Sequence, residues 1–365
     1  MRFTYLEKYG GAEVRRSVVL DRKSLKPGKW FYLRAPKIFI EKILPKLTYK
    51  LGDFAEIKFG IKTGANDFFY MKDISQLYEA DYLVNPKKFE EWGVKAGTKE
   101  ELEKQGLIYI ENRIGKKFAI NIKDVSPLIK SPTELDSYII NEPTNLIFKP
   151  NPENKPGKES LKYIKWGEYQ NVRIQKGKNK GDFIKGYNNL RTTKAHKPYW
   201  YNVPDLKPAH IIPNRFIKER HFVSLSSTPV LAGDACALVY PQKDKIMNVW
   251  YYMNSTVYYL VEELYGMRMG GGGAPLQILA GSYKALPCFN LNNLNEDEDK
   301  IELLNRTVLP FKEELKNEKR RKLDIYVLET IGFKEPEEIV EKLYESYVEV
   351  VNDRIVKGKS SKKSN

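Results

Sequence analysis

Few residues of this chain have the types and spacing of a catalytic site. Glu56-Ile57-Lys58, with Asp53 just before it, fits the acid-x-lysine strand of metal-dependent nucleases. In those enzymes carboxylates hold the divalent cation on which the chemistry depends. Because a three-residue pattern often arises by chance, a DNA endonuclease that uses Asp53, Glu56 and Lys58 is only the alternative hypothesis.

Other catalytic and metal-binding motifs are absent from the sequence. An amino-methylating enzyme needs an Asn/Asp/Ser-Pro-Pro-aromatic loop, but neither Asn85-Pro86 nor Asn151-Pro152 is followed by a second proline. There is no phosphate-binding G-x-x-x-x-G-K-[ST] loop and no G-x-S-x-G elbow. The 2 cysteines and 3 histidines form no C-x-x-C or H-x-x-x-H pattern, so we expect no metal site. No catalytic residue is predicted.

Composition favours a polyanionic partner. The 365 residues carry 62 Lys and Arg against 47 Asp and Glu, a net charge of +15, together with 24 tyrosines. Lysine and arginine neutralise phosphates, and aromatic faces stack on bases. A heat-adapted or AT-biased genome gives a similar composition, which is the alternative explanation. The sequence contains no apolar run of membrane-spanning length and no signal peptide, so we expect a cytoplasmic protein.

Hydrophobic periodicity and turn residues predict an α+β fold. We expect a short strand in VRRSVVLD, a helix that begins at Pro36, and strands on both sides of a glycine-rich turn between residues 51 and 71. Further strands are predicted in LIYIEN, KFAINI, YWYNV, AHIIPNRF, RHFVSLSS and ACALVY. Residues 149–197, rich in Gly, Asn, Pro and Lys, are predicted to be a long surface excursion.

Helices dominate the predicted C-terminal region. Residues 245–265 are predicted to form one helix that Gly266 ends. After Asn290 we expect a helix interrupted or bent near Pro310, a second that Gly332 ends, and a third that Pro336 begins. The predicted organisation is a lead-in segment (1–29), a mixed, β-rich body (30–290) and a helical section with a basic tail (291–365).

One motif is more specific than any of these. Residues 60–70, GIKTGANDFFY after LGDFAEIKF, closely resemble the signature of the C-terminal specificity domain of TaqI-like adenine-N6 DNA methyltransferases. This domain also occurs in fused type IIG restriction–modification enzymes and is similar to the target-recognition domains of type I specificity subunits. The resemblance to this domain extends to further segments: WFYLRAP, VSPLIKSPTEL, KYIKWGE, GGGGAPLQILAGSYKALPCF, RRKLDIYVLETIGF and VEVVNDRIVKGKS. The matches run from about Trp30 to the C-terminus, and the methyltransferase core is missing.

The resemblance implies a DNA-contacting loop. Gly60 and Gly64 would allow the positive-φ turns of a protruding loop, while Phe68, Phe69 and Tyr70 would anchor it in the core. Lys62, Thr63, Asn66 and Asp67 would reach base edges or phosphates. The alternative is an ordinary turn in which Asn66 and Asp67 satisfy backbone groups.

Two other groups of residues are candidates for phosphate contacts. Lys130, with Ser131, resembles a family position; a merely solvated lysine is the alternative. In residues 158–197 cations far outnumber acids, which favours a clamp on the DNA backbone over a solvated loop. The cations of that segment expected to contact DNA are Arg173, Lys176, Lys178, Lys180 and Arg191. Trp166 and Trp200 are expected in the core.

The resemblance also implies a division of labour. The chain would bind double-stranded DNA as the specificity part of an adenine-N6 restriction–modification system. A methyltransferase subunit acting in trans would bind S-adenosylmethionine, and this chain would hold no cofactor. The C-terminal helices would dock that subunit or a second copy of the chain, or simply pack within the chain. A folded, non-functional remnant of a split gene is a further alternative.

Overall fold

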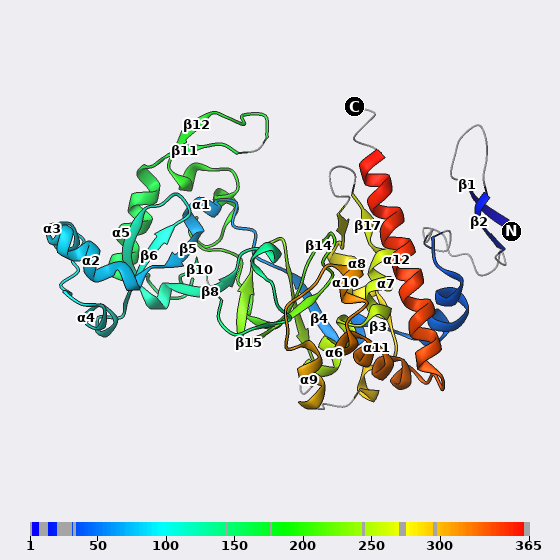
Figure 1. The fold of residues 1–365 in the computed structure, drawn as a ribbon. Coiled ribbons are helices and arrows are strands. Elements are labelled where there is room, and N and C mark those ends of the chain that lie inside the picture. The colour runs from blue at the N-terminus through cyan, green and yellow to red at the C-terminus, as the bar shows by residue number, and fades with distance from the viewer. Residues whose placement is uncertain are drawn as a thin grey trace. The chain divides into compact units, whose positions relative to one another are not determined.

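The computed structural model describes residues 2–6, 14–19, 31, 34–143, 145–175, 177–242, 245–269, 275–294 and 298–360. The chain forms two compact units (Figure 1). Unit 1 contains Met1–Ile57, Asn214–Val223 and Val239–Asn365, and unit 2 contains Lys58–Pro213 and Ser224–Leu238. The predicted segments 1–29, 30–290 and 291–365 follow the order of the sequence, whereas these units join segments that are far apart in it. Each unit is described by itself below.

Unit 2 is built on a mixed sheet. Its neighbouring strands, in spatial order, are β13 (Ala209–Pro213), β15 (Val223–Ala232), β8 (Val125–Ile129), β10 (Asn145–Phe148), β5 (Tyr70–Asp73), β6 (Leu107–Asn112) and β7 (Lys117–Asn121). β15 runs parallel to β8, while the pairs from β8 to β7 are antiparallel. β9 (Ile139–Ile140) pairs with β15. The chain passes between the units four times: within β4 (Ala55–Phe59), after β13, at the start of β15 and within β16 (Ala237–Pro241). The predicted α+β class is confirmed.

A helix lies where the sequence predicted only a surface excursion. Residues 149–197 contain α5 (Lys158–Tyr169), whose Tyr163 and Ile164 are buried in the core of unit 2. The Tyr163 ring stacks on Phe68 at 4.6 Å between centroids, and its hydroxyl donates to the Phe68 carbonyl at 2.6 Å. Helix and sheet approach closely at Gly167, where a Cβ would lie 2.6 Å from the Phe68 ring. Because the residues around α5 have a composition typical of loops, the sequence did not predict this helix.

The rest of unit 2 consists of short elements. The hairpin β11 (Asn171–Arg173) and β12 (Phe183–Lys185) follows α5 and extends beyond the sheet (Figure 1). The short helices are α1 (Asn66–Phe69), α2 (Tyr78–Val84), α3 (Pro86–Glu91) and α4 (Lys99–Lys104). Helices α2 to α4 enclose a second core around Tyr78, Phe89 and Tyr109. The strand predicted in YWYNV is wrong, since residues 199–203 form a turn and an irregular segment.

Unit 1 is mainly helical. Its longer helices are α6 (Ile246–Met253), α7 (Thr256–Tyr265), α11 (Glu318–Ile331) and α12 (Pro336–Ser360). The shorter ones are α8 (Ala280–Ala285), α9 (Glu298–Leu304) and α10 (Phe311–Glu314). An irregular helical segment spans residues 37–46 and is π-helical over Phe39–Ile43 and 3-10-helical over Leu44–Lys46. The strands pair as β1 (Arg2–Leu6) with β2 (Val14–Val19), as β3 (Tyr49–Lys50) with β19 (Pro287–Cys288), and as β14 (Phe216–Ile217), β18 (Leu276–Gln277) and β17 (Met267–Arg268).

One helix prediction for unit 1 is wrong. The helix predicted over 245–265 breaks at Asn254, because the Asn254 side chain bonds both the N–H and the carbonyl of Val223, and Ser255 then caps α7 by accepting from the Tyr258 N–H. The first helix predicted after 290 is interrupted near Pro310, which is one of the two predicted forms, and consists of α9 and α10. Gly332 does end α11 with φ +92°, and Pro336 does begin α12. The four-glycine run and most of residues 1–29 lie outside the described part of the chain.

Candidate nucleic-acid interface

Residues 60–67, the glycine loop, are held in place by close backbone contacts within unit 2. The Ile61 N–H donates to the Ala232 carbonyl at 2.7 Å, and Ile61 forms a parallel bridge with Gly233. Gly60 has no positive φ, which corrects one expectation; it must be glycine because a Cβ would overlap the Gly233 carbonyl. Gly64 does have a positive φ of +68°, as predicted. The loop is therefore a rigid turn.

Inside the loop, polar side chains divide into supporting and exposed groups. Thr63 is 1% exposed; its hydroxyl donates to Asn66 Oδ1 at 2.5 Å and accepts from the Ala65 N–H at 3.2 Å. Thr63 therefore supports the loop and is too buried to contact a ligand, unlike the exposed Lys62 beside it. Phe68, Phe69 and Tyr70 are buried, as expected. Asn66 and Asp67 are half-buried.

A polar recess of about 310 Å³ lies beside the loop. It is lined by Tyr70, Met71, Lys72, Glu111, Asn112, Arg113, Gly115, Lys130 and Asn145. Arg113 Nε lies 3.8 Å from Asp67 Oδ1, which joins the loop to the recess. Burial raises the pKa of Tyr70, so its hydroxyl stays protonated. The recess presents cationic and amide groups, which suit the acceptor-rich edges of bases.

Lys130 and Ser131 are less available than the sequence suggested. Lys130 Nζ forms an ion pair with Glu134 Oε1 at 2.6 Å, which neutralises its charge. The Ser131 hydroxyl accepts from the Thr133 N–H at 3.3 Å and lies 3.0 Å from the Thr133 hydroxyl. A phosphate bound here would have to compete with both contacts. Lys130 is nevertheless brought to the recess beside the loop, as Arg113 is.

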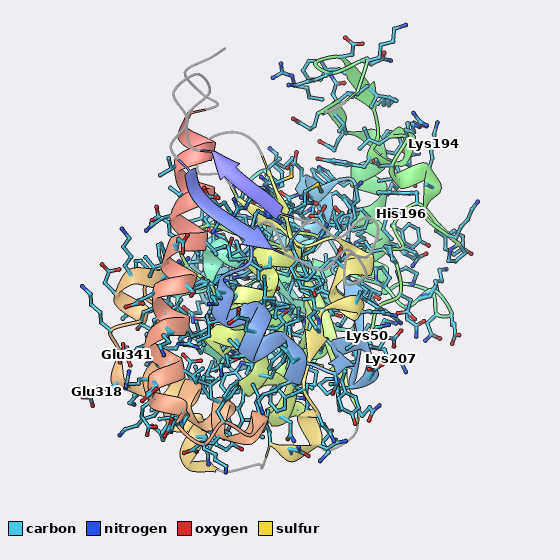
Figure 2. All side chains as sticks on the ribbon, turned by 90° about the vertical axis from the view of Figure 1, so that its right-hand side faces the viewer. Lys50, Lys194, His196, Lys207, Glu318 and Glu341 are labelled. Carbon is cyan, nitrogen blue, oxygen red and sulfur yellow. The ribbon has the colours of Figure 1, made fainter. Side chains whose placement is uncertain are left out.

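On another side, the loop contacts the segment that carries Arg191. The Thr192 hydroxyl donates to the Gly64 carbonyl at 3.0 Å, and a Cβ at Gly64 would overlap the Thr192 side chain. Arg191 and Lys194 are exposed on this segment, and Figure 2 labels Lys194 together with nearby His196. His196 Nδ1 lies 2.9 Å from the Trp200 carbonyl, and burial lowers its pKa. The sequence-predicted Lys62, Asn66, Asp67, Lys130 and Arg191 thus lie around one loop.

The β11–β12 hairpin carries the other predicted cations. Its tip turns through Gly177 and Gly181, both with positive φ, and Arg173, Lys178 and Lys180 are exposed. Its base is tied to α5 by the Gly186 N–H, which donates to the Gln170 carbonyl at 2.7 Å. Lys176 lies outside the described residues. Lys162, a further lysine of residues 158–197, lies on α5 and donates to the Trp92 carbonyl.

Some exposed cations of this part of unit 2, unlike Arg113 and Lys130, form no ion pair with any residue that the structure describes. They are Lys62, Arg173, Lys178, Lys180 and Arg191. The sequence analysis missed Arg113 and Lys72, which reach the recess only because β5 pairs with β6. No local pattern marks either residue.

The nuclease alternative gains no geometric support. Asp53 Oδ2 accepts the Lys50 N–H at 2.8 Å, so this carboxylate caps a turn. Over the described ranges of the chain, no group of three or more His, Cys, Asp or Glu side chains could hold a metal ion. Cys236 and Cys288 are buried free thiols. In the same ranges, every helix is too short or too polar to span a bilayer.

A network of buried titratable groups lies in the core of unit 1. His221 Nε2 contacts Glu262 Oε2, and Tyr258 donates to Glu262 Oε1 at 2.9 Å. Burial raises the pKa of Glu262 well above 4.5. Burial, with Arg354 and Arg320 nearby, lowers the pKa of His221 well below 6.5. Both groups are therefore neutral in the fold, which marks a packing network rather than a catalytic pair.

No protein-family model and no curated protein matches the chain. The solved structures similar to it include restriction–modification enzymes. One is the type IIG restriction endonuclease BpuSI, with 15% identity and a TM-score of 0.47, covering 86% of this chain and 33% of that one. Another is the type IIL restriction–modification enzyme MmeI in complex with DNA, with 11% identity and a TM-score of 0.40, covering 84% and 37%. The chain thus spans about a third of the length of these enzymes.

Proposed function

We propose that this chain binds double-stranded DNA through unit 2 and serves as the specificity part of an adenine-N6 restriction–modification system. A methyltransferase supplied by a partner chain would bind S-adenosylmethionine and carry out the reaction in the cytoplasm. The TaqI-like signature in residues 60–70 supports the family assignment, and the surface of unit 2 supports DNA as the ligand.

One observation carries the proposal: exposed cations that form no ion pair with described residues lie on the same unit as the glycine loop and the polar recess. Lys62, Arg173 and Arg191 are such cations. Free cations of this kind release counterions from DNA phosphates and set the register of the protein on the duplex.

The recess beside the loop supplies the groups for reading sequence. Arg113 can donate in a bidentate manner to guanine, and an amide such as that of Asn66 can pair with adenine. Rigid support by Thr63 and Gly64 keeps such donors at fixed positions, which lowers the entropy lost on binding. The proposal therefore assigns phosphate contacts to the exposed lysines and base contacts to the loop and recess.

Salt-dependent binding to duplex DNA tests the proposal. The purified chain is titrated into a fluorescent 30-base-pair duplex (about the length needed to cover two helical turns and flanks) between about 50 and 200 mM salt. We expect a steep negative dependence of log K on log salt, with no requirement for S-adenosylmethionine. Binding that is absent or independent of salt would overturn it.

The same preparation separates the nuclease alternative. Plasmid DNA is incubated with the chain and Mg²⁺, with Glu56→Ala as the matched variant. We expect both proteins to leave the plasmid intact. Cleavage that disappears in Glu56→Ala would instead assign the chain to the nucleases.

A further inference from the structure

We propose that the outer face of the β11–β12 hairpin, together with Tyr169 at the end of α5, is a stacking site for unpaired DNA bases. This inference rests on the proposed DNA-binding function and adds a second mode of binding to it. The site is separate from the recess, since none of its residues lines that recess.

The two faces of the hairpin differ sharply. In the antiparallel register Val172 pairs with Ile184, and both pack against the core of unit 2. The neighbouring pair, Arg173 and Phe183, must point the other way because side chains alternate along a strand. One face thus holds the hairpin on the unit and the other is free to meet a ligand.

Two aromatic rings of the proposed site are exposed and do not pack in the core of unit 2. Phe183 is 63% exposed and Tyr169 is 62% exposed, which is unusual for rings of this size in an ordered hairpin and helix. Neither ring is among the aromatic residues of the core of unit 2. Their apolar faces remain available for a flat ligand.

Cations accompany both rings. Lys185 Nζ lies 5.3 Å from the centroid of the Tyr169 ring, and Arg173 is the cross-strand partner of Phe183. Between residues 171 and 185 the sequence contains 5 Lys and Arg but 1 acid, Asp182. Rings alternating with cations are the arrangement that binds single strands, because bases stack on the rings while the cations hold the phosphates.

Exposed faces of aromatic side chains favour a ligand whose bases are unpaired. In an intact duplex each base is covered above and below by its neighbours, so an external aromatic ring cannot stack on it. A strand with unpaired bases offers those faces. The excess of positive charge favours DNA over an apolar protein segment, which would gain nothing from Arg173 and Lys185.

Two labelled ligands test the inference: a single-stranded oligothymidylate and a mixed-sequence duplex. In the double variant Tyr169→Ala/Phe183→Ala, we expect single-strand affinity to fall by at least about tenfold. Duplex affinity should change less than about twofold, because the cations and the glycine loop are intact. The double variant Tyr169→Trp/Phe183→Trp should keep single-strand affinity, since indole rings also stack.

Controls make each outcome decisive. Tyr49→Ala removes a ring of unit 1 that is 42% exposed and should leave both affinities unchanged. Quenching of 2-aminopurine placed in the single strand reports stacking directly and should disappear in the alanine double variant. If the wild type binds duplex but not single strands, or if the alanine variant loses both equally, the stacking site is overturned while duplex binding stands. If the wild type binds neither, the proposed function itself fails.

Discussion

At the scale of single residues, the glycine loop separates a supporting side chain from a contacting one. Thr63 is buried and hydrogen-bonded within the loop, whereas Lys62, next to it, is exposed. A substitution at Lys62 should therefore leave the loop intact and report on the ligand alone. Substitution at Thr63 would change the loop itself.

We expect Lys62→Ala to reduce discrimination between preferred and unrelated duplexes by about 1–3 kcal/mol, as the loss of one base contact does. Competition binding with a set of duplexes measures this difference. Lys87→Ala, an exposed lysine on α3, is the matched control and should have no effect. An equal loss on every duplex would identify Lys62 as a phosphate contact instead.

Glu262 gives a pH-dependent prediction for the stability of unit 1. Its pKa is raised by burial, so the folded state keeps a proton that the unfolded state loses above about pH 4.5. The stability contributed by this neutral group is full below that pH and declines as pH rises toward the folded pKa. Glu262→Gln stays neutral and avoids the decline.

The unfolding temperature of Glu262→Gln, relative to wild type, should therefore rise steadily from about pH 5 to pH 8. His221→Gln is the complementary variant: the lowered pKa of His221 costs stability as pH falls below 6.5. Its unfolding temperature relative to wild type should rise as pH falls from 6.5 toward 5. Differences that stay constant with pH would show that neither group is held neutral.

Much of the loop could be predicted from sequence, but the recess beside it could not. The positive φ of Gly64 and the burial of Phe68, Phe69 and Tyr70 are local properties of GIKTGANDFFY. Arg113 faces Asp67 only because β5 and β6 pair in one register. The ion pair between Lys130 and Glu134 likewise depends on side-chain conformations that spacing does not fix.

At the scale of elements, the lysines of the β11–β12 hairpin predict how strongly DNA binding depends on salt. Lys178 and Lys180 are exposed at its tip and have no ion pair recorded within the described chain. If both contact phosphates, Lys178→Ala/Lys180→Ala should reduce the slope of log K against log salt by about 2, since each contact contributes about 0.9.

The matched control is Lys87→Ala/Lys104→Ala, which removes the same charge from exposed positions on α3 and α4. Anisotropy titrations at several salt concentrations measure both slopes. Equal slopes in the two variants would mean that the hairpin tip does not touch the DNA backbone and that net charge alone drives binding.

Helix α5 shows why some elements escaped prediction. Its sequence, KESLKYIKWGEY, contains three lysines and follows a stretch rich in proline and asparagine. The helix is stabilised by tertiary contacts, in particular the stack of Tyr163 on Phe68, rather than by propensity. By contrast, α12 begins at a proline and α11 ends at a glycine, so local signals in the sequence predict these two helix ends.

At the scale of the whole molecule, the C-terminal helices belong to the core of unit 1. Arg354 on α12 forms a buried ion pair with Glu263 on α7 at 2.8 Å, and Arg320 on α11 pairs with Glu314 at 2.9 Å. Removing one partner of a buried pair costs about 3–5 kcal/mol, because the other charge is left buried and uncompensated. The helices are therefore not separable from α6 and α7.

A fragment of residues 30–290 should consequently fold only in part. It keeps every segment of unit 2 but leaves Glu263 without Arg354. We expect rapid hydrogen exchange throughout α6 and α7 and slow exchange in β5, β6 and β8, with the full chain as control. Protection of α6 and α7 in the fragment would support the predicted boundary at residue 290.

The four passages of the chain between the units bear on any attempt to change specificity. Unit 2 is assembled from two stretches, and the second supplies β15, an interior strand of its sheet. Exchanging residues 58–213 alone for those of a relative would pair a foreign sheet with the original strand. An exchange of DNA specificity on this chain therefore has to replace residues 58–213 and 224–238 together.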